Sequence, residues 1–405
     1  MAGLGLVLLM MRLALSRSSL FNKDFFVLSV WAVAVSLSGF TSVVYNNTPD
    51  YTYATYIISM FVWCGGAYTL VSLIRKVHGK ASVFLLCNYL VAVCVMQCII
   101  AMMINKIPAF EEFVNNIVGG LGFVDMDDLA DYDRLYGIGA SLDVAGSRFS
   151  VVLVMIAYVL TEIYKTKYKN CIVWYLIAFV IISIIGNMMA RTTTVGIGLF
   201  LMFILYKSRI YLMRLSESVR KLFLWLGIVL MIAIPVTVYL YNTDYQTRSN
   251  IRFAFEGFFS LAEKGEWDVH SNEILKNMYV FPDNPKTWLI GDGYIENPRA
   301  TDPYYTGKIY GGYYKATDVG YLRFIYYFGL VGLFCFCMFM LKAGQIVTKR
   351  FEKEKLMLWV VLAVNFIVWF KVSTDIFLVF ALFLCINKEE NDEYNNSILL
   401  EKAES

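Results

Sequence analysis

Charged residues are scarce in this sequence. They make up 17% of its 405 residues, whereas 59% of the chain is hydrophobic. Because soluble domains typically contain about 25% charged and about 45–50% apolar residues, this composition excludes an ordinary soluble domain. The formal net charge of +3 gives no reason to expect a nucleic-acid partner.

Residues that bind metals are also few. The chain has 2 His, His78 and His270, and its 8 Cys fall in apolar runs or at their edges, without the pairwise spacing of a zinc site. The acidic stretch Asp125–Asp133 lacks the glycine-containing spacing of a calcium loop, so a solvated loop is the preferred interpretation. We therefore expect no disulfide, no metal and no other cofactor.

Long apolar runs are what the sequence has instead. Runs of about 20 residues recur along the whole chain, which is typical of a polytopic helical membrane protein. We predict an all-α membrane helical bundle with about eleven transmembrane helices. The predicted spans are residues 1–15, 25–45, 51–74, 82–104, 149–164, 171–190, 192–206, 221–241, 318–341, 356–371 and 374–387.

Basic residues predict the orientation of these spans. They gather in every second connection, and the positive-inside rule places those connections in the cytoplasm. We therefore expect a multi-pass membrane protein with these connections on its cytoplasmic side. This orientation puts the N-terminus outside, which a partial first span or a start further upstream would explain. The basic clusters are Arg12–Lys23, Arg75–Lys80, Lys165–Lys169, Lys207–Lys221 and Lys342–Lys355.

The orientation divides the chain into two membrane portions and two polar segments. Residues 1–241 form the first part of the bundle, with an outer loop at 105–148, and residues 318–387 form the second part. Residues 388–405 are an acidic cytoplasmic tail that we expect to be disordered. The other polar segment, residues 242–317, is a large extracytoplasmic loop.

The large loop is the largest non-membrane piece of the chain. Loops of this length are usually functional or disordered, and the many aromatic residues here argue against disorder. We predict helices at Ser249–Lys264 and Ser271–Tyr279, lying against the membrane face. The loop is therefore the first place to look for a site.

Arginines recur on the predicted outer face. The planar guanidinium group can pair with two oxygens at once, which suits it to binding a diphosphate. For any single arginine, a residue snorkelling at the membrane rim is equally consistent, but the set favours an anionic, lipid-linked substrate. Arg191 interrupts a short outer hairpin against the charge bias. The set comprises Arg134, Arg148, Arg191, Arg248 and Arg252, with Arg323 just inside the membrane.

A carboxylate marks the start of the span that follows the large loop. Asp318 can cap the free N–H groups of this helix, or it can face the site as a catalytic base, and the residues leave both roles open. Tyr321, one turn on, is either an interface aromatic or a substrate contact. Arg323 lies five positions beyond Asp318, about 140° further around a helix, so we expect no direct salt bridge between them.

Several short motifs occur in order around the large loop, from about Arg134 to the last span. The motifs are Asp133-Arg134-Leu135-Tyr136-Gly137 with Arg148, Ala190-Arg191-Thr192-Thr193, Arg248 with Arg252, Leu289-Ile290-Gly291-Asp292-Gly293, Thr317-Asp318-Val319-Gly320-Tyr321 and Tyr327-Phe328-Gly329-Leu330-Val331-Gly332. Each is weak alone, but their order resembles the bacterial O-antigen polymerase and ligase superfamily, most closely the Wzy-type polysaccharide repeat-unit polymerases.

The resemblance implies a metal-independent membrane glycosyltransferase. It would join undecaprenyl-diphosphate-linked oligosaccharide repeat units into lipopolysaccharide O-antigen or capsular polysaccharide. The active site would lie at the outer face of the cytoplasmic (inner) membrane, and the enzyme could work with a chain-length regulator protein. Arg191, with Arg148 or Arg134, would bind the leaving diphosphate, and Asp318 would orient or deprotonate the acceptor hydroxyl. The other expected substrate contacts are Arg248, Arg252, Tyr321 and Arg323.

Three alternatives stay open. An O-antigen ligase would transfer the glycan to another acceptor, but the ligase branch commonly has a His near the position of Asp318, which favours the polymerase. A lipid-linked oligosaccharide flippase or transporter would need charged residues deep in several spans, and the predicted spans contain few. A purely structural membrane subunit would leave the arginines without a role.

Overall fold

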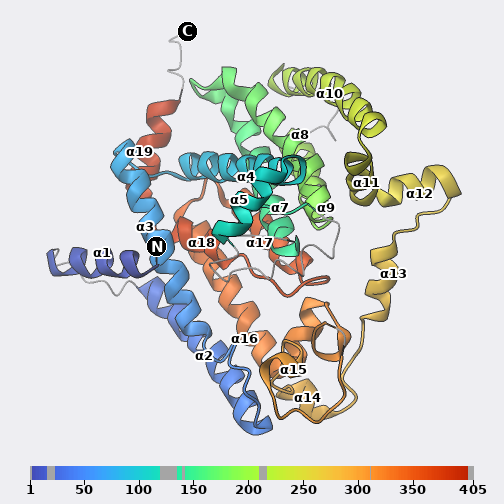
Figure 1. The fold of residues 1–405 in the computed structure, drawn as a ribbon. Coiled ribbons are helices and arrows are strands. Elements are labelled where there is room, and N and C mark those ends of the chain that lie inside the picture. The colour runs from blue at the N-terminus through green and yellow to red at the C-terminus, as the bar shows by residue number, and fades with distance from the viewer. Residues whose placement is uncertain are drawn as a thin grey trace. The chain divides into compact units, whose positions relative to one another are not determined.

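The chain folds into helices joined by loops (Figure 1). The computed structural model describes residues 2–15, 23–118, 135–138, 142–208, 217–310 and 312–399. They divide into two compact units. The first comprises Met1–Val83 and His270–Asp392, and the second comprises Phe84–Val269 and Glu393–Ser405.

Among the described residues, the first unit contains three helices from the start of the chain and seven from its last third. They are α1 (Ala2–Leu15), α2 (Lys23–Asn46), α3 (Tyr56–His78), α13 (His270–Asn277), α14 (Pro285–Leu289), α15 (Pro298–Thr301), the 3-10 helix η5 (Tyr314–Ala316), α16 (Gly320–Arg350), α17 (Lys355–Val368) and α18 (Phe377–Leu384). Helix α19 (Lys388–Ile398) begins in the first unit and ends in the second.

The second unit contains the middle of the chain. Its helices are α4 (Val83–Lys106), α5 (Pro108–Val118), α7 (Leu142–Glu162), the 3-10 helices η2 (Ile163–Lys165) and η3 (Lys169–Cys171), α8 (Ile172–Met189), α9 (Thr193–Ser208), α10 (Glu217–Thr243), α11 (Tyr245–Ala254) and α12 (Glu256–Lys264).

Seven helices in the described part of the chain are long and apolar enough to cross a membrane, namely α2, α3, α4, α7, α8, α10 and α16. Helices α9 and α17 are apolar but shorter. The prediction of an all-α, polytopic membrane bundle is confirmed, and a lipid bilayer is the environment that these helices require. The number of about eleven spans stays a prediction, because α1 has only 14 residues and α18 only 8.

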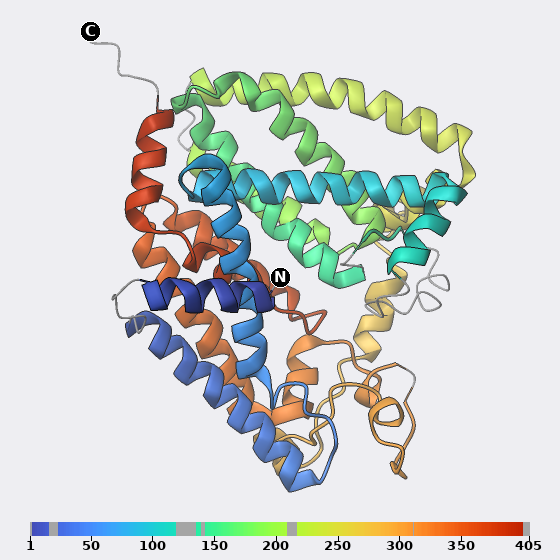
Figure 2. The same cartoon turned by 60° about the vertical axis from the view of Figure 1, so that its left-hand side comes forward.

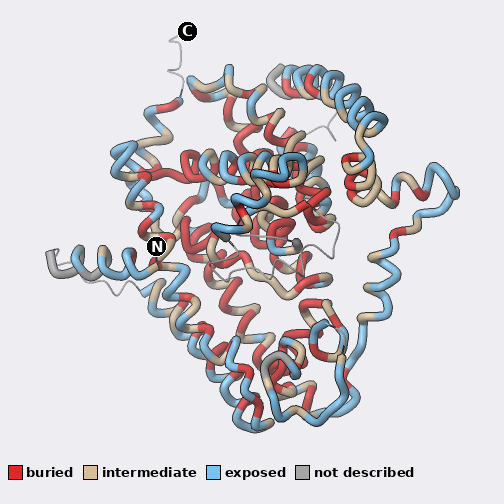
Figure 3. The backbone as a smooth tube through the Cα atoms, in the orientation of Figure 1, coloured by how far each residue is buried: buried red, intermediate tan, exposed pale blue. Residues whose placement is uncertain are grey.

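Helix α7 forms the centre of the second unit. In the apolar 18-residue stretch of this span, 83% is buried inside the protein. The corresponding share for α10 is 11%, which leaves most of that helix exposed for contact with lipid (Figure 3). Helix α9 packs closely on α7 because Gly196 faces Ser150, and a Cβ on Gly196 would lie 2.3 Å from the Ser150 Cα. The Ser150 hydroxyl donates to the carbonyl of Thr192 at 2.9 Å, which ties α7 to the α8–α9 connection.

The first unit is built on an aromatic core. Helices α2 and α16 run side by side in both views (Figures 1 and 2). Trp369 is fully buried and contacts Phe324 and Phe336, with ring centroids 4.8 and 5.0 Å apart. Tyr53, in the connection between α2 and α3, contacts Phe324 at 5.6 Å. Large buried rings of this kind dominate the packing energy of a core.

Helix α16 is broken in its first half, which the prediction of one continuous span at 318–341 missed. Gly329 has φ +67° and ψ −173°, a conformation that favours glycine, and a Cβ there would lie 2.2 Å from the Leu289 carbonyl. The freed carbonyls of Tyr326 and Tyr327 accept hydrogen bonds from the N–H groups of Asp292 and Gly293, at 2.6 and 3.1 Å. A break at membrane depth needs such internal partners.

The Gly291-Asp292-Gly293 segment is thus a tight turn that docks on the break. Gly291 and Gly293 both have positive φ, 87° and 76°. The Asp292 carboxylate accepts hydrogen bonds from Lys286 Nζ and Thr287 Oγ1, both at 2.6 Å. These contacts give the segment a structural role as a turn.

The acidic tail was expected to be disordered, and this expectation is wrong for Lys388–Ile398, which form α19. Glu390 pairs with Arg75 on α3 at 3.0 Å, and Asn391 Oδ1 accepts the Val83 N–H at 2.9 Å. These partners lie far away in sequence, so tail composition alone did not reveal them.

Candidate functional site

Arg191 lies in the connection between α8 and α9, which threonine hydroxyls hold in place. Each hydroxyl of the run Thr192–Thr194 donates a hydrogen bond to a neighbour in α7 or α8, at 2.7, 3.1 and 2.7 Å. Thr192 and Thr193 are buried. Because the threonines point inward, the turn is fixed, and Arg191 is the long side chain that extends from it.

Arg248 and Arg252 lie one turn apart on α11 and therefore share a face of that helix. Asp244 is the N-cap of α11 and accepts a backbone N–H of the first turn at 2.6 Å. Lys106, at the end of α4, donates a hydrogen bond to Asp244 that lowers the pKa of this carboxyl to about 2. The chain bends at Phe255 and continues as α12, so the predicted helix Ser249–Lys264 is two shorter helices.

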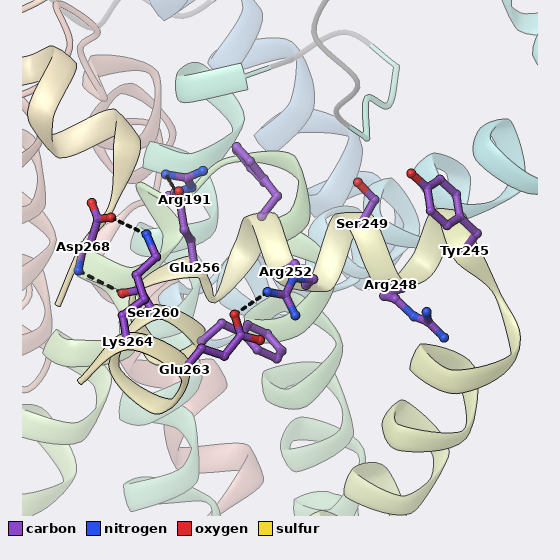
Figure 4. A pocket seen from close by; sticks show the side chains of 12 residues that line it. Arg191, Tyr245, Arg248, Ser249, Arg252, Glu256, Ser260, Glu263, Lys264 and Asp268 are labelled. Carbon is purple, nitrogen blue, oxygen red and sulfur yellow. Dashed lines mark hydrogen bonds and ion pairs between the residues drawn. The ribbon is translucent and has the colours of Figure 1, made fainter. Parts of the chain in front are cut away.

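These elements enclose one pocket of about 480 Å³ (Figure 4). It brings together three of the arginines singled out in the sequence, two from α11 and one from the α8–α9 connection. Its lining residues are Arg191, Tyr245, Arg248, Ser249, Arg252, Phe253, Glu256, Phe259, Ser260, Glu263, Lys264 and Asp268.

Carboxylates of α12 pair with two of these arginines. Arg191 Nη1 lies 2.7 Å from Glu256 Oε2, and the Arg191 guanidinium sits over the Phe253 ring with its carbon 4.0 Å from the centroid. Arg252 Nη2 donates to Glu263 Oε2 at 2.7 Å, a hydrogen bond that lowers the pKa of Glu263. The Arg191 side chain is 16% exposed and the Arg252 side chain 42%, so the first pair is the better shielded.

Arg248 has a different environment. Its guanidinium donates to the carbonyls of Tyr241 and Asn242, at 2.9 and 3.1 Å, and among the described residues no carboxylate pairs with it. Lys264 pairs with Asp268 at 2.8 Å. The pocket is therefore lined by four basic and three acidic side chains, a net charge of +1.

No family model, curated protein or solved structure matches the chain. The chemistry of the pocket has to be derived from its residues. Guanidinium groups over aromatic rings suit a phosphorylated ligand, because they offer several N–H donors in fixed directions. Within the described ranges no three His, Cys, Asp or Glu side chains are placed to hold a metal ion.

The structure does not place two predicted contacts, Arg134 and Arg148, among the residues that line the pocket. Arg134 lies outside the described residues, as do Asp125–Asp133. Arg148 is on α7 in the second unit and is not among the residues that line the pocket. Their predicted roles at the diphosphate stay predictions.

Asp318, Tyr321 and Arg323 belong to the first unit, whereas Arg191 belongs to the second. The pairing of Asp318 with Arg191 across a substrate therefore stays a prediction. Tyr321 packs against Phe370, with centroids 5.0 Å apart, and its hydroxyl donates to the carbonyl of Phe366 at 2.9 Å. These contacts favour a packing role for Tyr321 over a substrate contact.

Arg323 is almost completely buried and ties the large loop to α16. Its Nη2 donates to the Ile295 carbonyl at 3.1 Å and to Glu296 Oε1 at 3.0 Å. The guanidinium carbon lies 3.5 Å from the centroid of the Tyr313 ring. The Arg323 side chain is only 7% exposed. Its main role is therefore to hold the large loop against α16, which the sequence did not indicate.

The expectation that Asp318 and Arg323 do not interact is wrong. Asp318 Oδ1 lies 3.9 Å from Arg323 Nη1, a long ion pair. The angular argument failed because α16 begins only at Gly320, so Asp318 precedes the helix. Val319 occupies the N-cap position, which rules out the interpretation of Asp318 as the N-cap. The Asp318 side chain is 25% exposed, so it is accessible to a ligand.

Sequence reasoning missed Glu256 and Glu263, the carboxylates that partner the arginines. A signal was present for Glu256, which lies four positions after Arg252 in a predicted helix and so near the arginine face. Glu263 reaches Arg252 only because the chain bends at Phe255.

Proposed function

We propose that this protein is a membrane glycosyltransferase that joins undecaprenyl-diphosphate-linked oligosaccharide repeat units into O-antigen or capsular polysaccharide. The observation that carries the proposal is the convergence of Arg191, Arg248 and Arg252 on one pocket. The resemblance of the motifs to polysaccharide polymerases supports the same reaction, with the site at the outer face of the cytoplasmic membrane.

In the proposed reaction the growing chain on undecaprenyl diphosphate is the donor. The bond from its anomeric carbon to the phosphate oxygen breaks, and a bond from that carbon to a hydroxyl oxygen of the next lipid-linked repeat unit forms. The hydroxyl proton passes to a base, for which Asp318 is the predicted residue. Undecaprenyl diphosphate leaves, and the three arginines stabilise the charge that develops on it.

The pocket suits this ligand in size and in chemistry. Its volume of about 480 Å³ is within the range of small-molecule sites, about 300–1,000 Å³, and can hold a diphosphate with an adjoining sugar. Phe253 and Phe259 lie under Arg191 and Arg252, at 4.0 and 4.9 Å. Arginines held in this way lose little conformational freedom when they bind an anion.

The break in α16 raises the transporter alternative, since discontinuous helices often form substrate sites in transporters. In this protein the freed carbonyls of Tyr326 and Tyr327 already accept hydrogen bonds from the Asp292–Gly293 turn. Their engagement with the chain itself favours a structural role for the break, and hence the glycosyltransferase.

Complementation of a deletion strain tests the proposal. Parental protein should restore long surface polysaccharide, whereas Arg191→Ala should leave single repeat units on the surface. Arg299→Ala, a change at an exposed arginine of the large loop that does not line the pocket, is the matched control. Loss of all glycan from the lipid core would indicate a ligase, and repeat units trapped inside the cell would indicate a flippase.

A further inference from the structure

Glu256 forms an ion pair with Arg191, whose guanidinium group is the proposed binding partner of the diphosphate. Its Oε2 lies 2.7 Å from Arg191 Nη1, while Phe253 covers a face of the same guanidinium. The turn that carries Arg191 is fixed by buried threonines, so Arg191 is not expected to swing towards a new partner. A phosphoryl oxygen that binds Nη1 on the side now taken by Glu256 Oε2 must therefore displace the Glu256 carboxylate.

Displacing the Glu256 carboxylate from Arg191 costs little free energy because of where Glu256 lies. It is in the first turn of α12, where the positive end of the helix dipole stabilises a negative charge. Its side chain is 31% exposed, so the displaced carboxylate can be hydrated. The exchange between carboxylate and phosphate can therefore run in both directions, with Arg191 in place throughout.

We infer that Glu256 competes with the diphosphate product for Arg191 and thereby promotes its release. The inference rests on the proposed function, because it gives Glu256 a role in clearing the same pocket after each transfer. A polymerase repeats its transfer many times, and product release limits the rate of many enzymes. A carboxylate that returns to Arg191 stops the pocket from holding the product. Glu256 is a positioning residue in this account, acting through Arg191.

Glu263 should have a smaller effect of the same kind. Its side chain is 51% exposed and that of Arg252 is 42% exposed, so water screens this pair. We expect Glu256→Gln to bind pyrophosphate about fivefold to tenfold more tightly than the parental protein, and Glu263→Gln about twofold more tightly. Glu273→Gln, a change at an exposed carboxylate of α13 that is not among the lining residues, is the matched control and should leave pyrophosphate binding unchanged.

The experiment uses the full chain in lipid nanodiscs with lipid-linked repeat units as substrate. Polymerisation is followed through the first turnover and into the steady state, and inhibition by inorganic pyrophosphate is measured for each variant. Glu256→Gln should show a burst in the first turnover, a slower steady rate and a pyrophosphate inhibition constant lowered by about fivefold to tenfold. Glu256→Asp keeps the charge with a shorter reach, should show the same changes more weakly, and serves if the glutamine variant does not accumulate.

Three results would overturn this role for Glu256. Weaker inhibition by pyrophosphate would mean that Glu256 only holds Arg191 in place. A slowed first turnover without tighter inhibition would make Glu256 a participant in the transfer itself. If pyrophosphate inhibits the parental protein but acts equally on Glu256→Gln, the release role fails while the proposed function stands. If pyrophosphate does not inhibit even the parental protein, the proposed function fails at this pocket.

Discussion

Replacement of Arg191 by lysine keeps the positive charge of the pocket but removes the planar fork. Arg191 Nη1 lies 2.7 Å from Glu256 Oε2 and the guanidinium carbon lies 4.0 Å from the centroid of the Phe253 ring, an arrangement that a lysine ammonium does not reproduce. Loss of one electrostatic donor to a developing charge typically costs about 10²–10³ in rate. We expect Arg191→Ala to lose about that factor, and Arg191→Lys to lose about 10-fold or more because a point charge remains.

The assay is the length distribution of surface polysaccharide, with the protein level measured by immunoblot. Arg299→Lys and Arg299→Ala control for the loss of an arginine from the predicted outer face. If Arg191→Ala polymerises normally at the parental protein level, Arg191 is a rim residue and the pocket has no role in transfer. If Arg191→Lys makes polymer of parental length, a positive charge alone is sufficient for transfer, and the planar guanidinium group is not required.

Four further predictions follow from the same structure. Asp318→Asn should insert stably into the membrane but make little polymer, and Asp318→Glu should be partly active. Full-length polymer from the asparagine variant would show that the reaction does not need the Asp318 carboxylate. Gly329→Ala should lower the free energy of unfolding by about 2 kcal/mol or more, because φ is +67° and a Cβ would lie 2.2 Å from the Leu289 carbonyl. An unchanged melting temperature would contradict this close approach of the two backbones. Excess chelator should leave polymerisation unchanged, and a rate restored by magnesium would contradict the assignment of charge stabilisation to arginine. Asn272→Cys should react with a membrane-impermeant thiol reagent in spheroplasts while Lys167→Cys should not, and the reverse pattern would invert the topology.

The helical framework was largely predictable because apolar length is a local property of the sequence. Each of the eleven predicted spans contains a helix, and the short α8–α9 connection around Arg191 was expected. Arg248 and Arg252 line the same pocket from one face of α11, whereas the predicted helix Ser249–Lys264 began after Arg248. That Arg191 joins them depends on packing between α8 and α11, for which the sequence offers no periodic signal.

What the sequence did not reveal depends on partners far away along the chain. The break at Gly329 requires the Gly291-Asp292-Gly293 turn beneath it, and α19 requires Arg75. The Asp318–Arg323 contact was missed because helix geometry was applied to a residue that precedes the helix. Glu263 reaches Arg252 across a bend that helix propensity does not predict.

The most direct test of the central claim is transfer by the purified full chain. Nanodiscs that contain the protein and a synthetic undecaprenyl-diphosphate-linked repeat unit should yield a ladder of polymers and release undecaprenyl diphosphate. Arg191→Ala should yield neither, and Arg299→Ala should yield both. If the parental protein moves the lipid-linked unit across the bilayer without forming a glycosidic bond, or if Arg191→Ala gives the same ladder, the arginine pocket is not a site of glycosyl transfer.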